Sequence, residues 1–303
     1  MRAPRALIPL FAVAGAAAVV VTAGARAAIE EGPSAAAPTL ADAGENAPFT
    51  AINAMTWNVC GDLGCRAPAD PAGAATQVAQ RVAASEVGGR QVRLNAVLLQ
   101  EVCSGHLDAL RAVKGLRSWS WAFAPERAKG GGDRACGNGR GTLGVAIGTD
   151  SALSDVERVR LPSPEPHGRS MVCGTVGAWR ARLCSVQASS RGWDDDPRGR
   201  WRAKQIAAIT ERAAGQRVII GGDLAERPGS PVLDPLYRSL AECDQGPGES
   251  RTGAMTLLDQ RGTPVAKTDY LFISRSAGVS CGVSPAPVRT SDHHPLAAAI
   301  RFR

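Results

Sequence analysis

Several polar side chains stand directly after or before apolar segments that are typical of β-strands. Asp223 follows the apolar residues 218–220 and two glycines, while Asn58 and Glu101 follow two other apolar runs. Asp292 stands shortly before the last apolar segment. Loops at one rim of a sheet bring such side chains together, and oxygen atoms are the ligands that hard divalent cations prefer. The pattern therefore predicts a metal site at the rim of an open sandwich of strands.

Five short motifs occur in order along the chain. They are M-T-W-N from residue 55, L-L-Q-E from residue 98, G-G-D-L-A from residue 221, T-D-Y-L-F from residue 268 and S-D-H-H-P-L from residue 291. In this order the chain resembles the endonuclease/exonuclease/phosphatase superfamily, the deoxyribonuclease-I-like phosphodiesterases, over residues 50–303. The resemblance implies an α+β fold, a four-layer α/β/β/α sandwich of two mixed sheets flanked by helices. It also implies hydrolysis of a phosphodiester by metal-assisted attack of water.

A metal-binding role for Glu101, Asp292 and Asn58 follows from the resemblance, with Mg²⁺ or Mn²⁺ as the expected cofactor. A divalent ion offsets the charge that develops on phosphate during hydrolysis. Glu101 is the best candidate for a direct ligand. Considered alone, its place after a strand equally suits a carboxylate that caps the helix expected from residue 104 onward.

The resemblance assigns catalytic roles as well. Asp223 matches an aspartate that orients or deprotonates the attacking water, and Asn58 is expected near the phosphate. Asp269 and His293 match a pair in which the carboxylate orients an imidazole beside the phosphate and supports its charged form. Two of the four histidines, His293 and His294, fall in this motif. Considered alone, Asp223 is also an ordinary turn residue.

Two positions depart from the superfamily pattern. Gln187 stands where these enzymes usually have histidine, and it can donate a hydrogen bond to phosphate but carries no charge. Ala225 stands where they usually have asparagine and offers no polar group. Arg191 and Arg227 lie nearby in sequence, and we predict that both bind substrate together with Gln187, because guanidinium groups suit phosphate. Considered alone, each arginine is equally consistent with an ordinary solvated loop residue.

Two functions are consistent with these residues. The first is a secreted, divalent-metal-dependent phosphodiesterase with nuclease-like chemistry, for which DNA, RNA, a lipid headgroup phosphodiester or a phosphomonoester all fit as substrate. The alternative is a weakened or inactive relative that binds a phosphorylated or polyanionic ligand. Loss of one transition-state donor can cost about 10²–10³ in rate, so Gln187 and Ala225 favour the alternative.

The N-terminus has the three parts of a secretory signal peptide. A basic start, an apolar run over residues 6–23 and the small-x-small sequence at 25–27 predict cleavage after residue 27. An uncleaved membrane anchor is the alternative, because about 18 apolar residues approach the length of a span. The composition of residues 28–49 predicts a disordered linker, and the length of residues 50–303 predicts a single domain. We expect a secreted monomer with no stable membrane association after cleavage and a net charge of +4, from 32 basic and 28 acidic residues. This mild basicity is compatible with a phosphate-bearing substrate, such as nucleic acid.

The eight cysteines all follow residue 27. An even number in an exported chain, without a C-x-x-C pair, predicts disulfides rather than a metal cluster. A hairpin over residues 174–183 would place Cys173 opposite Cys184. Cys60–Cys65 would close a small loop, and Cys103–Cys136 and Cys243–Cys281 follow by elimination.

Short apolar segments separated by turn residues predict nine strands, at 52–58, 95–100, 119–124, 142–148, 170–176, 181–187, 217–222, 268–274 and 295–302. Helical spacing of apolar residues predicts helices over 77–87 and 198–212, and a shorter one over 104–113 with Ser104 as its N-cap. Residues 194–196 are three consecutive aspartates, which we expect to form a solvated acidic cap over the N-terminus of a helix.

Overall fold

The computed structural model describes residues 50–62, 70–164, 168–246, 250–284, 286 and 288–302. The chain divides into two units, Met1–Glu45 and Asn46–Arg303, and all the described residues belong to the second. The predicted signal peptide, 1–27, and linker, 28–49, lie outside the described residues. Within the described ranges, no helix has both the length and the apolar character needed to cross a membrane.

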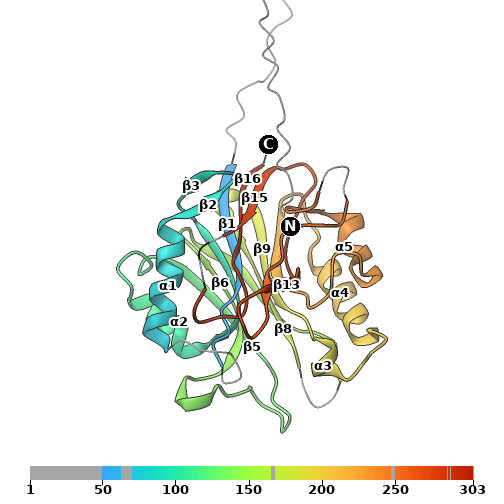
Figure 1. The fold of residues 1–303 in the computed structure, drawn as a ribbon. Helices are drawn as coiled ribbons and strands as arrows, with labels where there is room; N and C mark the ends of the chain where they lie inside the picture. The colour runs from blue at the N-terminus through green and yellow to red at the C-terminus, as the bar shows by residue number, and fades with distance from the viewer. Residues whose placement is uncertain are drawn as a thin grey trace, which may run out of the picture. The chain divides into compact units, whose positions relative to one another are not determined.

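Two six-stranded mixed sheets form the body of the second unit (Figure 1). In the first sheet, β1 is parallel to β4 and the other neighbours are antiparallel. Its strands in spatial order are β15 (Gly278–Val283), β16 (Leu296–Phe302), β1 (Thr50–Asn58), β4 (Ala96–Cys103), β6 (Leu143–Thr149) and β5 (Ser120–Pro125).

The second sheet repeats this arrangement, since β9 is parallel to β10 and the remaining pairs are antiparallel. Its strands in spatial order are β11 (Ala241–Glu242), β14 (Asp269–Ile273), β10 (Val218–Asp223), β9 (Ala181–Gln187), β8 (Ser170–Val176) and β7 (Leu153–Arg160). Two short hairpins pair β2 (Ser85–Val87) with β3 (Arg90–Val92) and β12 (Leu257–Leu258) with β13 (Pro264–Ala266).

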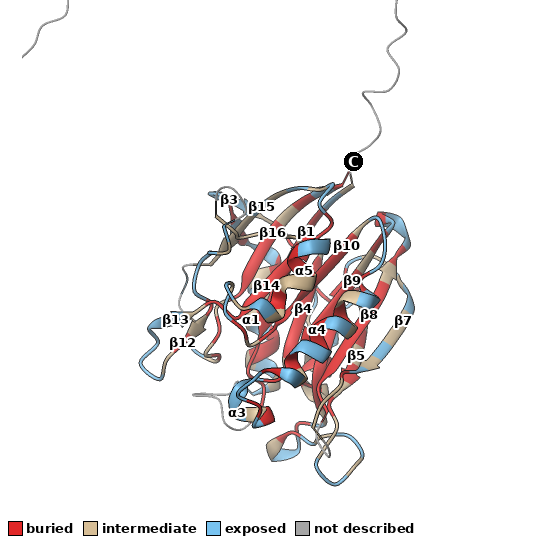
Figure 2. Cartoon of the chain, turned by 90° about the vertical axis from the view of Figure 1, so that its right-hand side faces the viewer, coloured by how far each residue is buried: buried red, intermediate tan, exposed pale blue. Residues whose placement is uncertain are grey.

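Three hydrophobic cores hold the layers together. Between the sheets, Ile52 and Leu98 of the first sheet share a core with Leu183 and Leu271 of the second. The other two cores lie between each sheet and the helices on its outer face. The helices on the first sheet are α1 (Pro71–Ala83) and α2 (Ser104–Ala112), and those on the second are α4 (Arg200–Arg212) and α5 (Asp234–Ser239). Figure 2 shows the buried strands behind α4 and α5, so the predicted four-layer sandwich is confirmed.

Strand β10 is apolar up to its last residue because both of its faces are buried. Ile219 faces the core between the sheets, while Val218 and Ile220 face the helices, so neither side is left for polar residues. A Cβ on Gly221 would lie 2.5 Å from Leu98 Cδ1, and one on Gly222 would lie 2.1 Å from the carbonyl oxygen of Val186. The two glycines therefore let the sheets close around the end of the strand.

The helix predictions need two corrections. The first helix spans Pro71–Ala83 rather than 77–87, because Asp70 caps it by accepting a hydrogen bond from Gly73 N at 2.8 Å. The residues beyond it form β2. Helix α2 is found as predicted, but Cys103 is its N-cap, and Ser104 Oγ instead accepts a hydrogen bond from Thr142 N. Helix α4 confirms the prediction for 198–212 to within two residues.

All nine predicted strands are present, and those that were missed lie at edges or in short hairpins. Strands β7 and β15 end the two sheets and carry alternating exposed residues. An edge strand with solvent on one side has no continuous apolar run for a pattern to detect.

Three predicted disulfides are confirmed: Cys103–Cys136, Cys173–Cys184 and Cys243–Cys281. Cys173 and Cys184 are direct partners in the β8–β9 register, as the hairpin predicted. Cys60 is also disulfide-bonded, whereas Cys65, its predicted partner, lies outside the described residues.

Candidate active site

Three of the predicted site residues lie side by side at one edge of the second sheet. Asp223 ends β10, where it pairs with Gln187 at the end of β9 and with Asp269 at the start of β14. The parallel β9–β10 pair and the antiparallel β10–β14 pair thus bring an amide and two carboxylates from distant sequence positions together.

The first sheet contributes Asn58 and Glu101 from its parallel strands β1 and β4. Glu101 lies at an irregularity in the β4–β6 pairing and has a positive φ of 49°, a strained conformation for a residue other than glycine. Its carbonyl oxygen accepts a hydrogen bond from Gly61 N at 2.7 Å, and a Cβ on Gly61 would lie 2.7 Å from the same oxygen. The close loop after β1 therefore requires a glycine and fixes Glu101 at the rim.

The loop before β16 is tied to the first sheet by two hydrogen bonds and braced by a third within the loop. Trp57 Nε1 donates to the His293 carbonyl at 2.9 Å. Ser291 Oγ donates to the Asn58 carbonyl at 2.7 Å and accepts from His293 N at 2.9 Å. Trp57 and Ser291, which belong to the sequence motifs, therefore hold His293 against Asp223 and Asp269.

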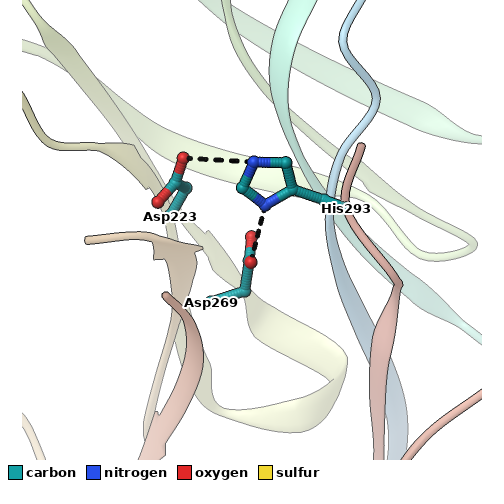
Figure 3. Close-up of side chains that lie close together, drawn as sticks. All are labelled: Asp223, Asp269 and His293. Carbon is teal, nitrogen blue, oxygen red and sulfur yellow. Dashed lines mark hydrogen bonds and ion pairs between the residues drawn. The ribbon is translucent and has the colours of Figure 1, made fainter. Parts of the chain in front are cut away.

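His293 and Asp269 form the predicted pair. His293 Nδ1 lies 2.7 Å from Asp269 Oδ2, and His293 Nε2 lies 3.9 Å from Asp223 Oδ2 (Figure 3). His293 Nε2 also lies 3.8 Å from Asp292 Oδ1. Burial by itself lowers the pKa of His293, but Asp269, Asp223 and Asp292 outweigh it and raise the pKa to about 10. The imidazole is therefore charged at neutral pH.

Asp223 is buried and accepts three hydrogen bonds. Its Oδ2 accepts from Asn58 Nδ2 at 3.2 Å and from Gln187 Nε2 at 3.0 Å, and its Oδ1 accepts from Ala225 N at 2.9 Å. Burial raises the pKa of Asp223, although charged His293 and the donor from Gln187 act in the opposite direction. Asn58 thus contacts the carboxylate of Asp223 directly.

These groups surround a cavity of about 240 Å³. Its walls include four of the predicted site residues, Glu101, Gln187, Asp223 and His293. Asp269 and Asn58 lie buried beside this cavity, and Asp292, whose side chain is 38% exposed, lies next to the His293 ring.

Arg169 also lines this cavity and was missed from the sequence. It is 5% exposed, its Nη1 lies 2.6 Å from Glu126 Oε1, and its guanidinium stacks over Trp193 at 4.5 Å. Burial by itself lowers the pKa of Arg169, but the negative charges of Glu126, Glu101 and Asp223 raise it. Its buried Nε has no hydrogen-bond partner among the described residues. No motif surrounds Arg169, so an arginine directly before strand β8 was the only signal.

The donor set fits a hard divalent cation. Glu101 is half-buried, burial raises the pKa of its carboxyl group, and no described residue donates a hydrogen bond to its carboxylate. A carboxylate of this kind suits Mg²⁺ or Mn²⁺ as a ligand. Asp223, Asp269 and His293 also have ligand atoms within 4.8 Å of one another. Within this trio, His293 Nδ1 is hydrogen-bonded to Asp269 and the carboxylates raise the pKa of the imidazole, which is the arrangement of an acid–base group.

The predicted substrate-binding residues separate into two places. Gln187 is only 2% exposed, lines the cavity that holds His293, and donates a hydrogen bond from Nε2 to Asp223. Its Oε1 has no partner among the described atoms. Arg191 and Arg227 are exposed and line a neighbouring cavity rather than the one that holds His293.

The acidic loop after Arg191 was only partly predicted. Residues Arg191–Asp194 form a short helix, α3, and Asp195 is exposed. Asp196 Oδ2 caps α4 by accepting from Trp201 N at 2.8 Å, but Asp196 is buried. Asp194 is buried as well and binds Arg202 Nη1 at 2.7 Å. The prediction of a solvated cap was wrong for both, because the Asp194 carboxylate pairs with buried Arg202 and Arg202 Nη2 also donates to the main-chain carbonyl of Asp196 at 2.9 Å.

The chain matches the model of the "Endonuclease/Exonuclease/phosphatase family" over residues 55–293. No curated protein matched. Among solved structures, the human Nocturnin catalytic domain with a bound sulfate anion is 17% identical, with a TM-score of 0.60 over 84% of this chain and 94% of that one. A variant of the 3′ phosphatase NExo from Neisseria, bound to a product DNA hairpin, is 19% identical, with a TM-score of 0.57 over 82% and 98%.

Proposed function

Because the chain belongs to the endonuclease/exonuclease/phosphatase family, we propose that it is a secreted, divalent-metal-dependent phosphodiester hydrolase. One observation supports this most strongly. Charged His293, buried Arg169 and the carboxylate of Asp223 face one small cavity, so two cations and a base surround the space for a single phosphate.

In this proposal each residue has a separate task. Arg169 and His293 bind the non-bridging oxygens of the phosphate and stabilise the charge that grows on them. Asp269 holds the His293 ring through Nδ1, which leaves the Nε2 proton for the phosphate. Asp223 accepts the proton of the attacking water, and Asn58 holds its carboxylate in place.

Glu101 and Asp292 would hold the metal ion, with Asn58 beside them. When bound, a divalent ion lowers the pKa of water and neutralises phosphate charge. Export is supported by the signal-peptide pattern of residues 1–27 and by the disulfides, which persist in oxidising compartments.

The test is turnover by the purified chain with its disulfides formed. Plasmid DNA, RNA and bis-p-nitrophenyl phosphate are each incubated with Mg²⁺, with Mn²⁺ and with a chelator. We expect metal-dependent cleavage that falls about 10²-fold or more in Asp223→Asn. Asp108→Asn, a matched change at an exposed position on α2, should leave the rate unaltered. Cleavage that persists in the chelator or in Asp223→Asn would contradict the proposal.

Gln187 favours a second function, a binding protein on the same scaffold. One of the two N–H groups of its side-chain amide is directed to Asp223, which leaves fewer donors for phosphate, and Ala225 has no side-chain donor at all. If folded protein binds phosphorylated ligands by calorimetry but cleaves none of the three substrates, the binding function replaces the hydrolytic one.

A further inference from the structure

A second cavity adjoins the one that holds His293. It has a volume of about 630 Å³, and its walls share Ser190, Ala225, Leu257 and Thr268 with the smaller cavity. The smaller one, at about 240 Å³, lies below the volume of 300–1,000 Å³ that sites for whole small molecules occupy. A substrate larger than a phosphate group must therefore extend outside it, and the shared walls lead into the second cavity.

Two arginines give the second cavity its positive charge. Arg191 begins α3 and Arg227 follows the turn after β10, so two separate loops place them at the same cavity. Neither forms a salt bridge with a described residue. The nearby carboxylates of Asp194 and Glu226 are directed to Arg202 instead, at 2.7 and 2.5 Å.

The remaining wall contains the apolar residues Pro231 and Leu257 as well as polar residues such as Ser230 and Thr268. This combination suits a ligand with an uncharged body and an anionic group. Guanidinium groups bind phosphate through paired N–H donors, and an apolar wall suits a sugar or a base. On a nucleotide or nucleic acid substrate, the anionic group that follows the scissile phosphate is another phosphate.

We propose that the substrate carries a second phosphate, which binds between Arg191 and Arg227 while the scissile phosphate lies beside His293. The inference rests on the proposed function and names its substrate class, a compound with two phosphates separated by a nucleoside-sized group. A nucleic acid strand and a free nucleotide with two phosphates both supply this chemistry.

The experiment compares two substrates that differ by one phosphate. Thymidine 5′-(p-nitrophenyl phosphate) has the scissile phosphate alone, and its 3′-phosphorylated form has both. For a charge-assisted contact we expect the KM to be lower by about tenfold for the two-phosphate substrate. In the double variant Arg191→Gln, Arg227→Gln this preference should disappear, whereas the exposed Arg117→Gln, which makes the same kind of charge change elsewhere, should retain it. Equal KM values in the unaltered protein would overturn the inference.

Binding without turnover separates this inference from the proposed function. Thymidine 3′,5′-bisphosphate and thymidine 5′-phosphate are titrated by calorimetry in the presence of Mg²⁺. Tighter binding of the bisphosphate that depends on the two arginines supports the second site even if no substrate is cleaved. Equal binding, together with cleavage of the one-phosphate substrate, supports the proposed function and overturns the inference. Preferential cleavage of a DNA or RNA tetranucleotide over the 3′-phosphorylated p-nitrophenyl substrate would show that the second phosphate comes from a nucleic acid strand.

Discussion

Asp269 controls both the position and the charge of His293. It is fully buried and bound to the imidazole Nδ1 at 2.7 Å. Burial by itself lowers the pKa of His293, and Asp269 contributes most among the three carboxylates that raise it. The charge of the imidazole is therefore a property of its neighbours and not of histidine itself.

Asp269→Asn tests this relation. The amide can still accept a hydrogen bond from Nδ1, but it provides no negative charge, so we expect kcat to fall about 10²-fold or more. The pKa of His293, followed by NMR of its ring protons, should fall below its value of about 10. Asp108→Asn serves as the control, and an unchanged His293 pKa would show that Asp269 is not the source of the charge.

Gln187 and Ala225 are the residues at which the chain departs from its family. Ala225 has a positive φ of 54°, a conformation that asparagine adopts more readily than alanine. Gln187 holds Asp223 and leaves one buried oxygen without a partner among the described residues. The side chain present at each position is therefore locally unfavourable, through backbone strain at Ala225 and through that buried oxygen at Gln187.

The double variant Gln187→His, Ala225→Asn should therefore be faster. Two additional polar groups would contact the phosphate, and each such donor is worth about 10²–10³ in rate when removed from other enzymes. We expect kcat on bis-p-nitrophenyl phosphate to rise at least about tenfold by the same principle. A rate equal to that of the unaltered protein would mean that Arg169 already supplies these contacts.

At the scale of elements, strand β11 contains a buried acid that makes stability depend on pH. Glu242 is 2% exposed and lies 3.3 Å from Lys267 Nζ. Burial raises its pKa to about 7, although Lys267 acts in the opposite direction. Between its ordinary pKa of 4.5 and this value, the folded protein therefore binds a proton that the unfolded chain has released.

Because the folded state holds the extra proton, the free energy of unfolding should decrease as pH rises through this window. The Glu242 contribution is on the order of 3 kcal/mol, from the difference between its folded and ordinary pKa values. Urea unfolding at about pH 5 and about pH 8 measures it, and Glu242→Gln should show a smaller loss between the two pH values. Glu86→Gln, at the exposed middle residue of β2, is the control, and parallel pH profiles for all three proteins would contradict the assignment.

For the molecule as a whole, the Cys243–Cys281 disulfide joins the two sheets. Cys243 follows β11 in the second sheet, and Cys281 lies in β15 at the edge of the first. Cys173–Cys184, in contrast, joins adjacent strands of one hairpin. The sequence separations of the pairs are 38 and 11 residues.

Replacing both cysteines of a pair by serine should therefore have unequal effects. In the chain-entropy model, loss of the cross-sheet disulfide costs about 4 kcal/mol and loss of the hairpin disulfide about 3 kcal/mol. Denaturant unfolding of the two double variants measures the difference. A larger loss for the hairpin pair would mean that local packing, rather than loop length, determines these contributions.

The sequence by itself determined the family, the nine main strands and most of the candidate site. These features depend on short patterns: an apolar strand, then Asn58, Glu101 or Asp223, and the Asp292–His293 motif before the last strand. Of the three confirmed disulfides, Cys173–Cys184 followed from a predicted hairpin, whereas the other two followed only by elimination. These patterns can be read from short stretches of sequence, because a strand buried on both faces must be apolar and its polar residues must lie at the rim of the sheet.

Only the tertiary structure decided which charges meet. Arg169 belongs to no motif, and its role depends on Glu126 and Glu101, which come from other strands and loops. The direction of Gln187 towards Asp223 and the place of Arg191 and Arg227 in a separate cavity follow from packing in the same way. Electrostatic energy depends on distance in space, and a sequence gives distance only along the chain.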